Sequence, residues 1–459
     1  MRNYLLAGTS ALALTFAAGA AFADTAPGKF DIKISGDAYF EGGLVTQTND
    51  YMRASEFFAT TTTAAQRNGE KYGAGDFSNR FRLQINPEAK ADNGLTYGAV
   101  VRIRANFGNN NDVNPGFVDG DKAYIYVSGT FGEVRGGVTY GPSDVTYVSH
   151  PQDWQMLGIY DEWRTYTKYS SAYAWGQFGS GASSATGGVA SEGVQLLRSH
   201  NIDTKLVYYS PRFFGATPTT GLQGAISYTP HSGDGACGQV IAGTANDCNV
   251  SVNTGVSRLD YSNIATTQTT GFNDVVELTG NYVEKWGPWL LKVSAGYNTG
   301  SSLSSSAAAT ATKYSDLESF QFGAQVGYEN FILGGGYVNA GRSGYARTAG
   351  VLTNDQEAWN IGAQYTWGPI VGGIKFIEES DAGSTAIAGG RTLDALTGGV
   401  MYTVAPGLRV GLEDTYFWAQ NETGNNAFAS TTTTTNNVAG NATNKQTGNV
   451  LLGRAIVSF

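Results

Sequence analysis

The chain ends in GNVLLGRAIVSF, residues 448–459, and this stretch decides the fold. Its side chains alternate: one face is formed by Leu451, Gly453, Ala455, Val457 and Phe459, and the other by Leu452, Arg454, Ile456 and Ser458. Alternation with a period of two residues indicates a β-strand. Chain ends are usually frayed and polar, so a strand that runs to an aromatic last residue is expected to pair with another strand.

The same alternation recurs along the whole chain, whereas helical periodicity is nearly absent. In FQFGAQVGY (320–328) and WNIGAQYTW (359–367), apolar residues occupy every second position, and polar residues or glycine occupy the others. The pattern predicts sixteen strands, which start near residues 30, 76, 94, 120, 131, 201, 221, 273, 288, 316, 330, 355, 369, 391, 406 and 448.

The connections between these strands alternate between short turns and mostly longer segments rich in Thr, Asn, Ser, Gly and Ala. All the turns therefore lie at one end of the sheet and all the loops at the other, and an even strand count brings both termini to the turn end. This is the layout of an outer-membrane β-barrel, with short periplasmic turns and long external loops.

A closed sheet has no edge, so the last strand is expected to pair with the first, KFDIKISGDAYF (29–40). The terminal Phe459 would then lie at the membrane interface, with the aromatic residues beside the short turns, Trp286, Trp289, Tyr328 and Trp367. A soluble β-sandwich is the main alternative, but its long loops would not keep to one end. A β-solenoid needs a fixed repeat period, and we find none.

The first 23 residues, MRNYLLAGTSALALTFAAGAAFA, combine an early Arg2, an apolar stretch and an Ala-Phe-Ala ending. These features predict a secretory signal peptide at 1–23, followed by a single transmembrane barrel at 24–459. The formal net charge of −9 argues against a nucleic-acid partner, because phosphate binding needs a basic face. Cys237 and Cys248 either close one small disulfide loop or remain thiols. No cofactor or metal site is indicated.

Two arginine rows carry the main functional signal. NRFRLQIN (79–86) places Arg80 and Arg82 opposite its apolar residues, and VVRIRANF (100–107) does the same for Arg102 and Arg104. If the hairpin is symmetric about Asp92, Arg82 faces Arg102 and Arg80 faces Arg104. Like charges opposite one another destabilise a sheet, and a dry interior would raise that penalty.

The arginines are therefore expected to face a water-filled lumen, while their apolar neighbours face lipid. Arg135 and Lys33 are predicted to join this basic wall, on the same alternation. Salt bridges that merely brace the barrel are the alternative role for these side chains, and bracing is compatible with a pore.

The sequence resembles the general-diffusion porins of Gram-negative outer membranes, of the alphaproteobacterial type. The resemblance spans the mature chain and rests on FDIKISGDAYFEGGLV (30–45), GTFGEVRGGVTYG (129–141) and the strand ending in Phe459. It implies that the loop after the fifth strand folds inward and narrows the lumen, with its acidic residues facing a basic wall. It also implies a homotrimer in the outer membrane, in contact with lipid and lipopolysaccharide.

The long loop, 142–200, supplies the acidic residues Asp144, Asp153, Asp161 and Glu162. Folded into the lumen, they would set a transverse field against the basic wall, although each carboxylate is equally compatible with the outer surface. Trp154 and Trp163 are expected to pack this loop against the barrel.

Three functions compete. The leading prediction is a channel for passive diffusion of ions and small hydrophilic solutes. A substrate-selective channel for a sugar or an anion is the alternative, with a lumen track that involves Tyr39 or Arg409. An outer-membrane enzyme would need a nucleophile near His150, His200 or His231, and no nucleophile has convincing spacing to any of them. We therefore predict that the chain is not an enzyme.

Overall fold

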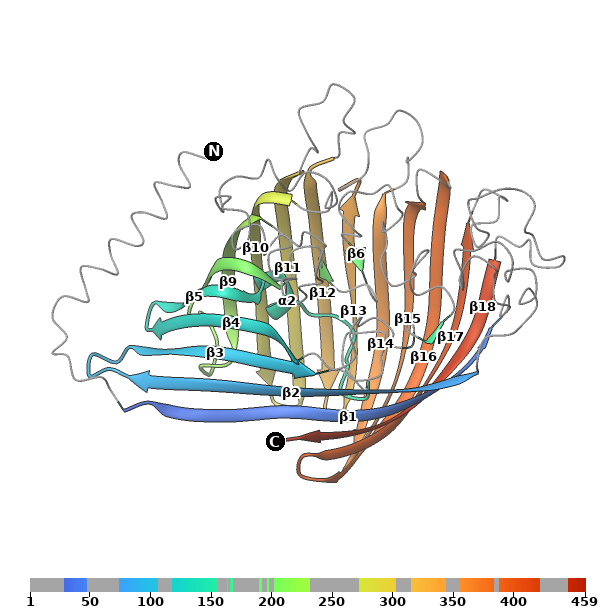
Figure 1. Ribbon diagram of the computed structural model, residues 1–459, viewed down its shortest axis with the longest axis horizontal. Coiled ribbons are helices and arrows are strands. Elements are labelled where there is room, and N and C mark those ends of the chain that lie inside the picture. The colour runs from blue at the N-terminus through green and yellow to red at the C-terminus, as the bar shows by residue number, and fades with distance from the viewer. Residues whose placement is uncertain are drawn as a thin grey trace.

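The computed structural model describes residues 29–47, 74–105, 118–155, 163, 166–167, 190–191, 196–197, 202–231, 272–302, 315–343, 355–383, 388–421 and 445–459. Within these ranges, sixteen antiparallel strands close into one barrel (Figure 1). The predicted fold class is therefore confirmed, and each strand begins close to its predicted position.

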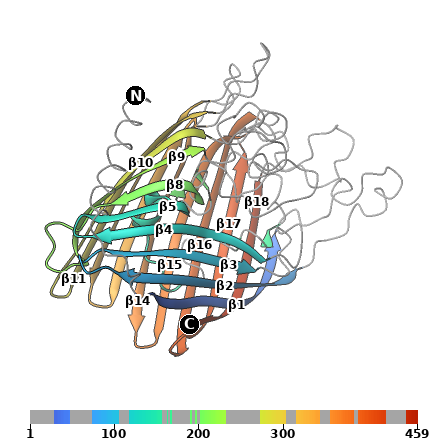
Figure 2. The ribbon, with the colours of Figure 1, turned by 60° about the vertical axis from the view of Figure 1, so that its left-hand side comes forward.

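The barrel strands are β1 Asp31–Gln47, β2 Gly75–Lys90, β3 Thr96–Ala105, β4 Val118–Gly129, β5 Gly132–Tyr140, β8 Ile202–Tyr209, β9 Gly221–His231, β10 Phe272–Trp286, β11 Trp289–Ser302, β12 Leu317–Tyr328, β13 Phe331–Gly341, β14 Gln356–Trp367, β15 Ile370–Gly383, β16 Ala388–Ala405, β17 Leu408–Asn421 and β18 Lys445–Ser458. Strands β1–β5 and β8 lie together on one side of the barrel, in front of the upright strands in Figure 2. The short helix α2 (Pro142–Val145) follows β5. The short strands β6 (Ala190–Ser191) and β7 (Leu196–Leu197) pair with each other and were not predicted. Among the described residues, no helix is long and apolar enough to cross a membrane.

The barrel closes where β1 pairs with β18, as predicted. Phe459 continues this pairing beyond β18, because its backbone N–H donates to Gly36 O at 3.0 Å and its carbonyl accepts from Gly36 N at 2.8 Å. A Cβ at position 36 would lie 2.7 Å from Cζ of the Phe459 ring. Glycine at this position therefore leaves room for the terminal aromatic ring beside the outer face of β1.

The alternation read from the sequence separates an exposed outer face from a covered inner face. In β14, Trp359, Ile361 and Tyr365 are exposed, whereas Asn360 and Gln364 are buried. The aromatic residues expected beside the short turns, Trp286, Trp289, Tyr328 and Trp367, are all exposed on the outer face. These turns lie together at one end of the barrel, as in an aromatic belt at a membrane interface.

The predicted register of the β2–β3 hairpin is wrong by two residues. Arg82 pairs with Arg104, and Gln84 pairs with Arg102. The turn is centred on Asn93 rather than Asp92, because Ala91 N donates to Leu95 O at 2.8 Å around it. Gly94 takes the left-handed conformation that this turn requires, with φ of 86°. A shift of two residues preserves the alternation, so the inward direction of the arginines is unaffected.

Candidate functional site

The described beginning of the loop after β5, residues 141–155, lies inside the barrel, along the inner face of β10–β16. Its beginning contacts β10, where Ser143 N–H donates to a Glu277 oxygen at 3.2 Å. Further along, Val148 N–H donates to Ser294 Oγ of β11 at 2.7 Å. Still further, Asp153 N–H donates to Gln364 Oε1 of β14 at 3.1 Å. The inward fold expected for this loop is therefore confirmed for the described residues 141–155.

Glycines on the inner wall make room for the loop. A Cβ at Gly323 would overlap the carbonyl of Val148, and one at Gly336 would overlap the Tyr147 hydroxyl. A Cβ at Gly399 would lie 2.9 Å from Cε3 of Trp154. Gly336 is the last residue of the run Gly334–Gly336 in β13. These glycines belong to β12, β13 and β16 and let the loop approach the backbone of the wall closely.

A buried ion pair holds the start of the loop. Lys205 Nζ of β8 lies 3.3 Å from Glu277 Oε1, and both side chains are fully buried. The other oxygen of Glu277 accepts hydrogen bonds from the backbone and hydroxyl of Ser143. A carboxylate that satisfies both a cation and two loop donors fixes the position of α2.

His150 also packs between the loop and the wall. Its ring nitrogens lie 3.1 Å from Asn360 Oδ1 and 2.8 Å from Gln155 Oε1. Ser149 Oγ lies 3.1 Å from Nδ1, which resembles a nucleophile–base pair. Both residues are buried, and Ser149 Oγ donates to Asn360 Oδ1 at 3.0 Å. The pair therefore positions the loop and offers no access to a substrate.

The two tryptophans pack the loop against the barrel, as predicted. Trp154 is completely buried, and its Nε1 donates to Pro151 O at 3.0 Å. Trp163 stacks on Phe417 at 5.2 Å and belongs to a buried apolar cluster on the inner face of β14–β18. The rule that apolar faces meet lipid fails here, because Ile377, Leu393 and Phe417 point inward and are covered by the loop.

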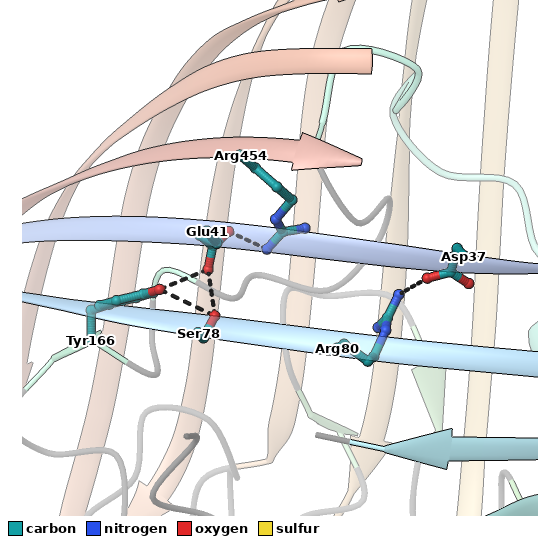
Figure 3. A network of polar contacts seen from close by, with 6 residues as sticks. All are labelled: Asp37, Glu41, Ser78, Arg80, Tyr166 and Arg454. Carbon is teal, nitrogen blue, oxygen red and sulfur yellow. Dashed lines mark hydrogen bonds and ion pairs between the residues drawn. The ribbon is translucent and has the colours of Figure 1, made fainter. Parts of the chain in front are cut away.

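A second anchor joins the loop to the seam between the first and last strands (Figure 3). The Tyr166 hydroxyl lies 2.9 Å from Glu41 Oε1 and 3.3 Å from Ser78 Oγ. Glu41 also forms an ion pair with Arg454 of β18. Burial, followed by the Glu41 carboxylate, raises the pKa of the Tyr166 phenol, so the phenol remains a hydrogen-bond donor. Sequence reasoning missed this cluster, although Glu41 and Arg454 alternate with apolar residues on adjoining strands.

The predicted basic residues lie on β1, β2, β3 and β5, but their surroundings differ. Arg80 pairs with Asp37 at 3.0 Å, and Arg135 pairs with Glu133. The first ion pair joins β2 to β1, whereas Arg135 and Glu133 both belong to β5. Lys33 lies near the turn end, where its exposed ammonium pairs with Glu88 at 2.8 Å.

The other arginines form a compact group on the inner face. Arg82 and Arg104 are register partners, and Arg102 is the register partner of Lys122 on β4. Arg102 NH2 donates to the Tyr140 hydroxyl at 3.2 Å, and Lys122 Nζ lies 4.0 Å from the centre of the Tyr140 ring. Lys122 was missed, although it alternates in phase with Tyr124 and Tyr126. We call Arg82, Arg102, Arg104 and Lys122 the basic cluster.

Two of the predicted acidic residues lie in the described part of the loop. Asp144 belongs to α2 and is partly buried. Asp153 is exposed, and its Oδ2 accepts from Gln364 Nε2 at 2.8 Å. Asp161, Glu162, Cys237 and Cys248 lie outside the described residues, as does His200.

The comparison with known families decides the identity. A model of the Gram-negative porin family matches residues 8–421. The chain is a Gram-negative porin. No curated protein matches its sequence at a significant level.

Solved porin structures are similar to this porin in fold. Salmonella typhi OmpF, in complex with daunomycin, has a TM-score of 0.51 at 13% identity, and the match covers 93% of this chain and 97% of that chain. A loop-deletion mutant of OmpT from Vibrio cholerae has a TM-score of 0.50 at 12% identity, with 94% and 99% covered. A double mutant of the Rh. blastica porin has a TM-score of 0.46 at 14% identity, with 94% and 100% covered. At these identities the likeness concerns the fold alone.

Membership of this family makes the protein a general channel of the outer membrane and not an enzyme. The barrel strands span the membrane, and the described beginning of the loop lies inside them.

Proposed function

We propose that the constriction of this porin lies between the basic cluster and the inner loop, and that ions and small hydrophilic solutes diffuse through it. The described loop residues contact β10–β18, β1 and β2, whereas the basic cluster belongs to β2–β4. The open path therefore passes along the basic side.

The observation that carries this proposal is the register of the basic cluster. On the β1 side, Arg82 has Asp37 as its register partner. On the β3 side, Arg82 is directly opposite Arg104, and Arg102 is directly opposite Lys122 of β4. Such pairs destabilise a sheet, and water is the environment that screens them best. Asp153 and Asp144 on the loop would supply the opposite sign, so solutes would experience a transverse field. Ion preference in such a pore follows the charges at its narrowest ring.

Planar-bilayer recordings test this proposal. We expect stepwise conductance, and a reversal potential in a salt gradient that shifts toward cations in the Arg82→Gln/Arg102→Gln variant. Lys33→Gln removes one positive charge at the exposed turn end, so it is the matched control for each single variant, Arg82→Gln or Arg102→Gln, and should shift the potential far less. An unchanged reversal potential in the double variant would exclude these arginines from the constriction.

A substrate-selective channel for an anion is the second candidate, because tyrosine rings lie close to several arginine side chains. Arg135 lies 5.4 Å from the Tyr124 ring centre and 4.7 Å from that of Tyr209. Arg80 and Arg454 lie 4.8 and 4.2 Å from the Tyr39 ring. Current block by one class of anion at low concentration would favour selectivity over general diffusion.

Porins are typically trimeric, and we propose a homotrimer here. Asp414 is exposed halfway along the outer face of β17, where it accepts from Asn449 Nδ2 at 3.2 Å. A carboxylate facing acyl chains is unfavourable, most of all near the midplane. Contact with a second copy over β17 and β18 would remove it from lipid. Migration of the unheated protein as a monomer on a gel would contradict this assembly.

We propose three further features that the sequence indicated. Residues 1–23 act as a signal peptide, and the opening strand and the 129–141 segment relate the chain to alphaproteobacterial porins. On the outer face, Tyr228 donates to Asp274 at 2.6 Å and Tyr337 to Glu357 at 2.8 Å, near the external ends of their strands. Such carboxylates suit contact with lipopolysaccharide through divalent cations. Mass spectrometry of the N-terminus of the exported protein tests the cleavage site.

A further inference from the structure

The connection between β8 and β9, residues 210–220, differs from the neighbouring turns at the periplasmic end. In the described chain, the turns at 287–288, 329–330, 368–369 and 406–407 contain two residues each. The β8–β9 connection is several times longer and contains two adjacent phenylalanines, Phe213 and Phe214. Its length needs an explanation that strand reversal alone does not supply.

The long connection has a defined structure. Phe213 and Leu222 exchange two backbone hydrogen bonds, at 2.9 and 2.8 Å. The Arg212 guanidinium donates to Gly221 O at 3.0 Å and to Asn281 Oδ1 at 3.1 Å. At the far end, Thr220 N donates to Thr217 O at 3.1 Å. These bonds hold the base and the tip of the connection, so the positions of the two phenylalanines are set by the fold.

Both rings lie on the outer side of the barrel. Phe213 is the bridge partner of Leu222, which points outward, and Arg212 reaches the inward-facing Asn281. Phe214 has a φ of 61°, a conformation that aromatic residues rarely adopt. Because this conformation interrupts the usual alternation, the two rings lie next to each other with centroids 6.3 Å apart. Their side chains are 47% and 88% exposed.

The surroundings indicate what covers this pair. Leu222 and Ile226 continue the same outer face along β9, and Trp286 is exposed at the end of β10. The connection carries one charged residue, Arg212, and its guanidinium is directed inward. An exposed aromatic pair that is continuous with the lipid-facing surface, beside a neutral threonine-rich tip, matches the chemistry of a membrane interface. A strained backbone conformation such as that of Phe214 persists only where surrounding interactions hold it in place.

We propose that Phe213 and Phe214 form a wedge that inserts into the periplasmic leaflet, with phospholipid as its partner. The wedge extends the lipid contact of the barrel beyond the periplasmic ends of β8 and β9. Strand β8 is the neighbour of β5, the strand that precedes the inner loop. It would hold the β8–β9 corner, and with it Lys205 at the loop anchor, at a constant depth in the membrane.

Spin-label accessibility in phospholipid bilayers tests the wedge. A nitroxide is placed at Phe214→Cys in a Cys237→Ser/Cys248→Ser background, and the matched control is Thr219→Cys on the same connection. The label at 214 should be several-fold more accessible to oxygen, relative to a water-soluble nickel complex, than the label at 219, because oxygen partitions into lipid. Phe213→Cys should resemble Phe214→Cys.

Heat-modifiable gel mobility and stepwise conductance establish that each labelled barrel is folded. If Phe214→Cys does not refold, Phe213→Cys carries the same comparison. Equal oxygen-to-nickel ratios at the phenylalanine positions and at 219 would overturn the proposal, because the pair would then lie in water like the rest of the connection.

Discussion

Gly399→Ala is expected to displace the inner loop, because the added methyl group meets the side chain that fixes the loop. Its Cβ would lie 2.9 Å from Trp154 Cε3 and 3.0 Å from the carbonyl oxygen of Leu412. Carbon atoms in contact prefer about 3.5–4.0 Å, so the indole must move by roughly 0.6–1 Å. The barrel backbone behind residue 399 is held by two neighbouring strands, so the movement falls on the loop.

The cost of this displacement follows from packing. Trp154 is completely buried, and overpacking of a buried site costs about 1–3 kcal/mol. This penalty is smaller than the cost of exposing the apolar wall, so the loop stays docked with its indole displaced. Because the wall lies behind the indole, the displaced loop moves toward the basic cluster. We therefore expect a lower single-channel conductance and more current noise.

The matched control is Gly398→Ala, one residue earlier on the same strand. Its Cβ would point outward, and its nearest neighbour would be Gly373 O at 3.9 Å. Trp154→Leu combined with Gly399→Ala should restore quiet currents, since the smaller side chain leaves room for the methyl group. Single-channel recording of the wild type, Gly399→Ala, Gly398→Ala and Trp154→Leu/Gly399→Ala tests this prediction. Wild-type conductance in Gly399→Ala, or an equal change in Gly398→Ala, would refute the reasoning.

Three further perturbations test the loop anchors. Tyr166→Phe removes a hydrogen bond to a carboxylate, worth about 1.5–3 kcal/mol, and should increase current noise, whereas Tyr328→Phe on the outer face should leave the current unchanged. Glu277→Gln should lower the melting temperature, because breaking a buried ion pair costs about 3–5 kcal/mol; Glu277→Gln/Lys205→Met should recover most of the loss, and no recovery would contradict the pairing. Trp163→Ala should cost about 3–5 kcal/mol of loop docking, seen as faster proteolysis of the loop in an intact barrel; an unchanged cleavage rate would show that Trp163 does not hold it.

The barrel could be predicted because the patterns that specify it, side-chain alternation and connection length, can each be read from a short stretch of sequence. Alternation in segments such as WNIGAQYTW reports which face each residue takes, and the length of each connection reports the end at which it lies. Both rules tolerate small errors, which is why the β2–β3 hairpin kept its arginines inward although its register was wrong. The turn centre at Asn93 depends on Gly94 in the left-handed conformation, and the sequence alone did not distinguish it from a centre at Asp92.

The site was less predictable because its contacts join residues that are far apart in sequence. Nothing near Tyr166 in the chain indicates Glu41 as its partner, and nothing near Trp154 indicates Gly399. A usable signal did exist in β16–β18, where both faces are apolar: Leu393 and Leu396, for example, take opposite faces of β16. A barrel strand that is apolar on its lumen side needs a cover, and the long loop after β5 was the available one.

That apolar lumen surface determines how the loop behaves. If the loop left the wall, Ile377, Leu393 and Phe417 would face lumen water, and exposing each side chain costs about 1.5–3 kcal/mol. The total is on the order of 5–9 kcal/mol before the polar anchors at Glu277 and Glu41 are counted. An excursion with that cost occupies well below one part in a thousand at equilibrium. In the wild-type protein the loop therefore acts as a fixed part of the channel wall, and changes in permeability arise from side chains at its surface and at the basic cluster, or from a substitution that shifts the docked loop.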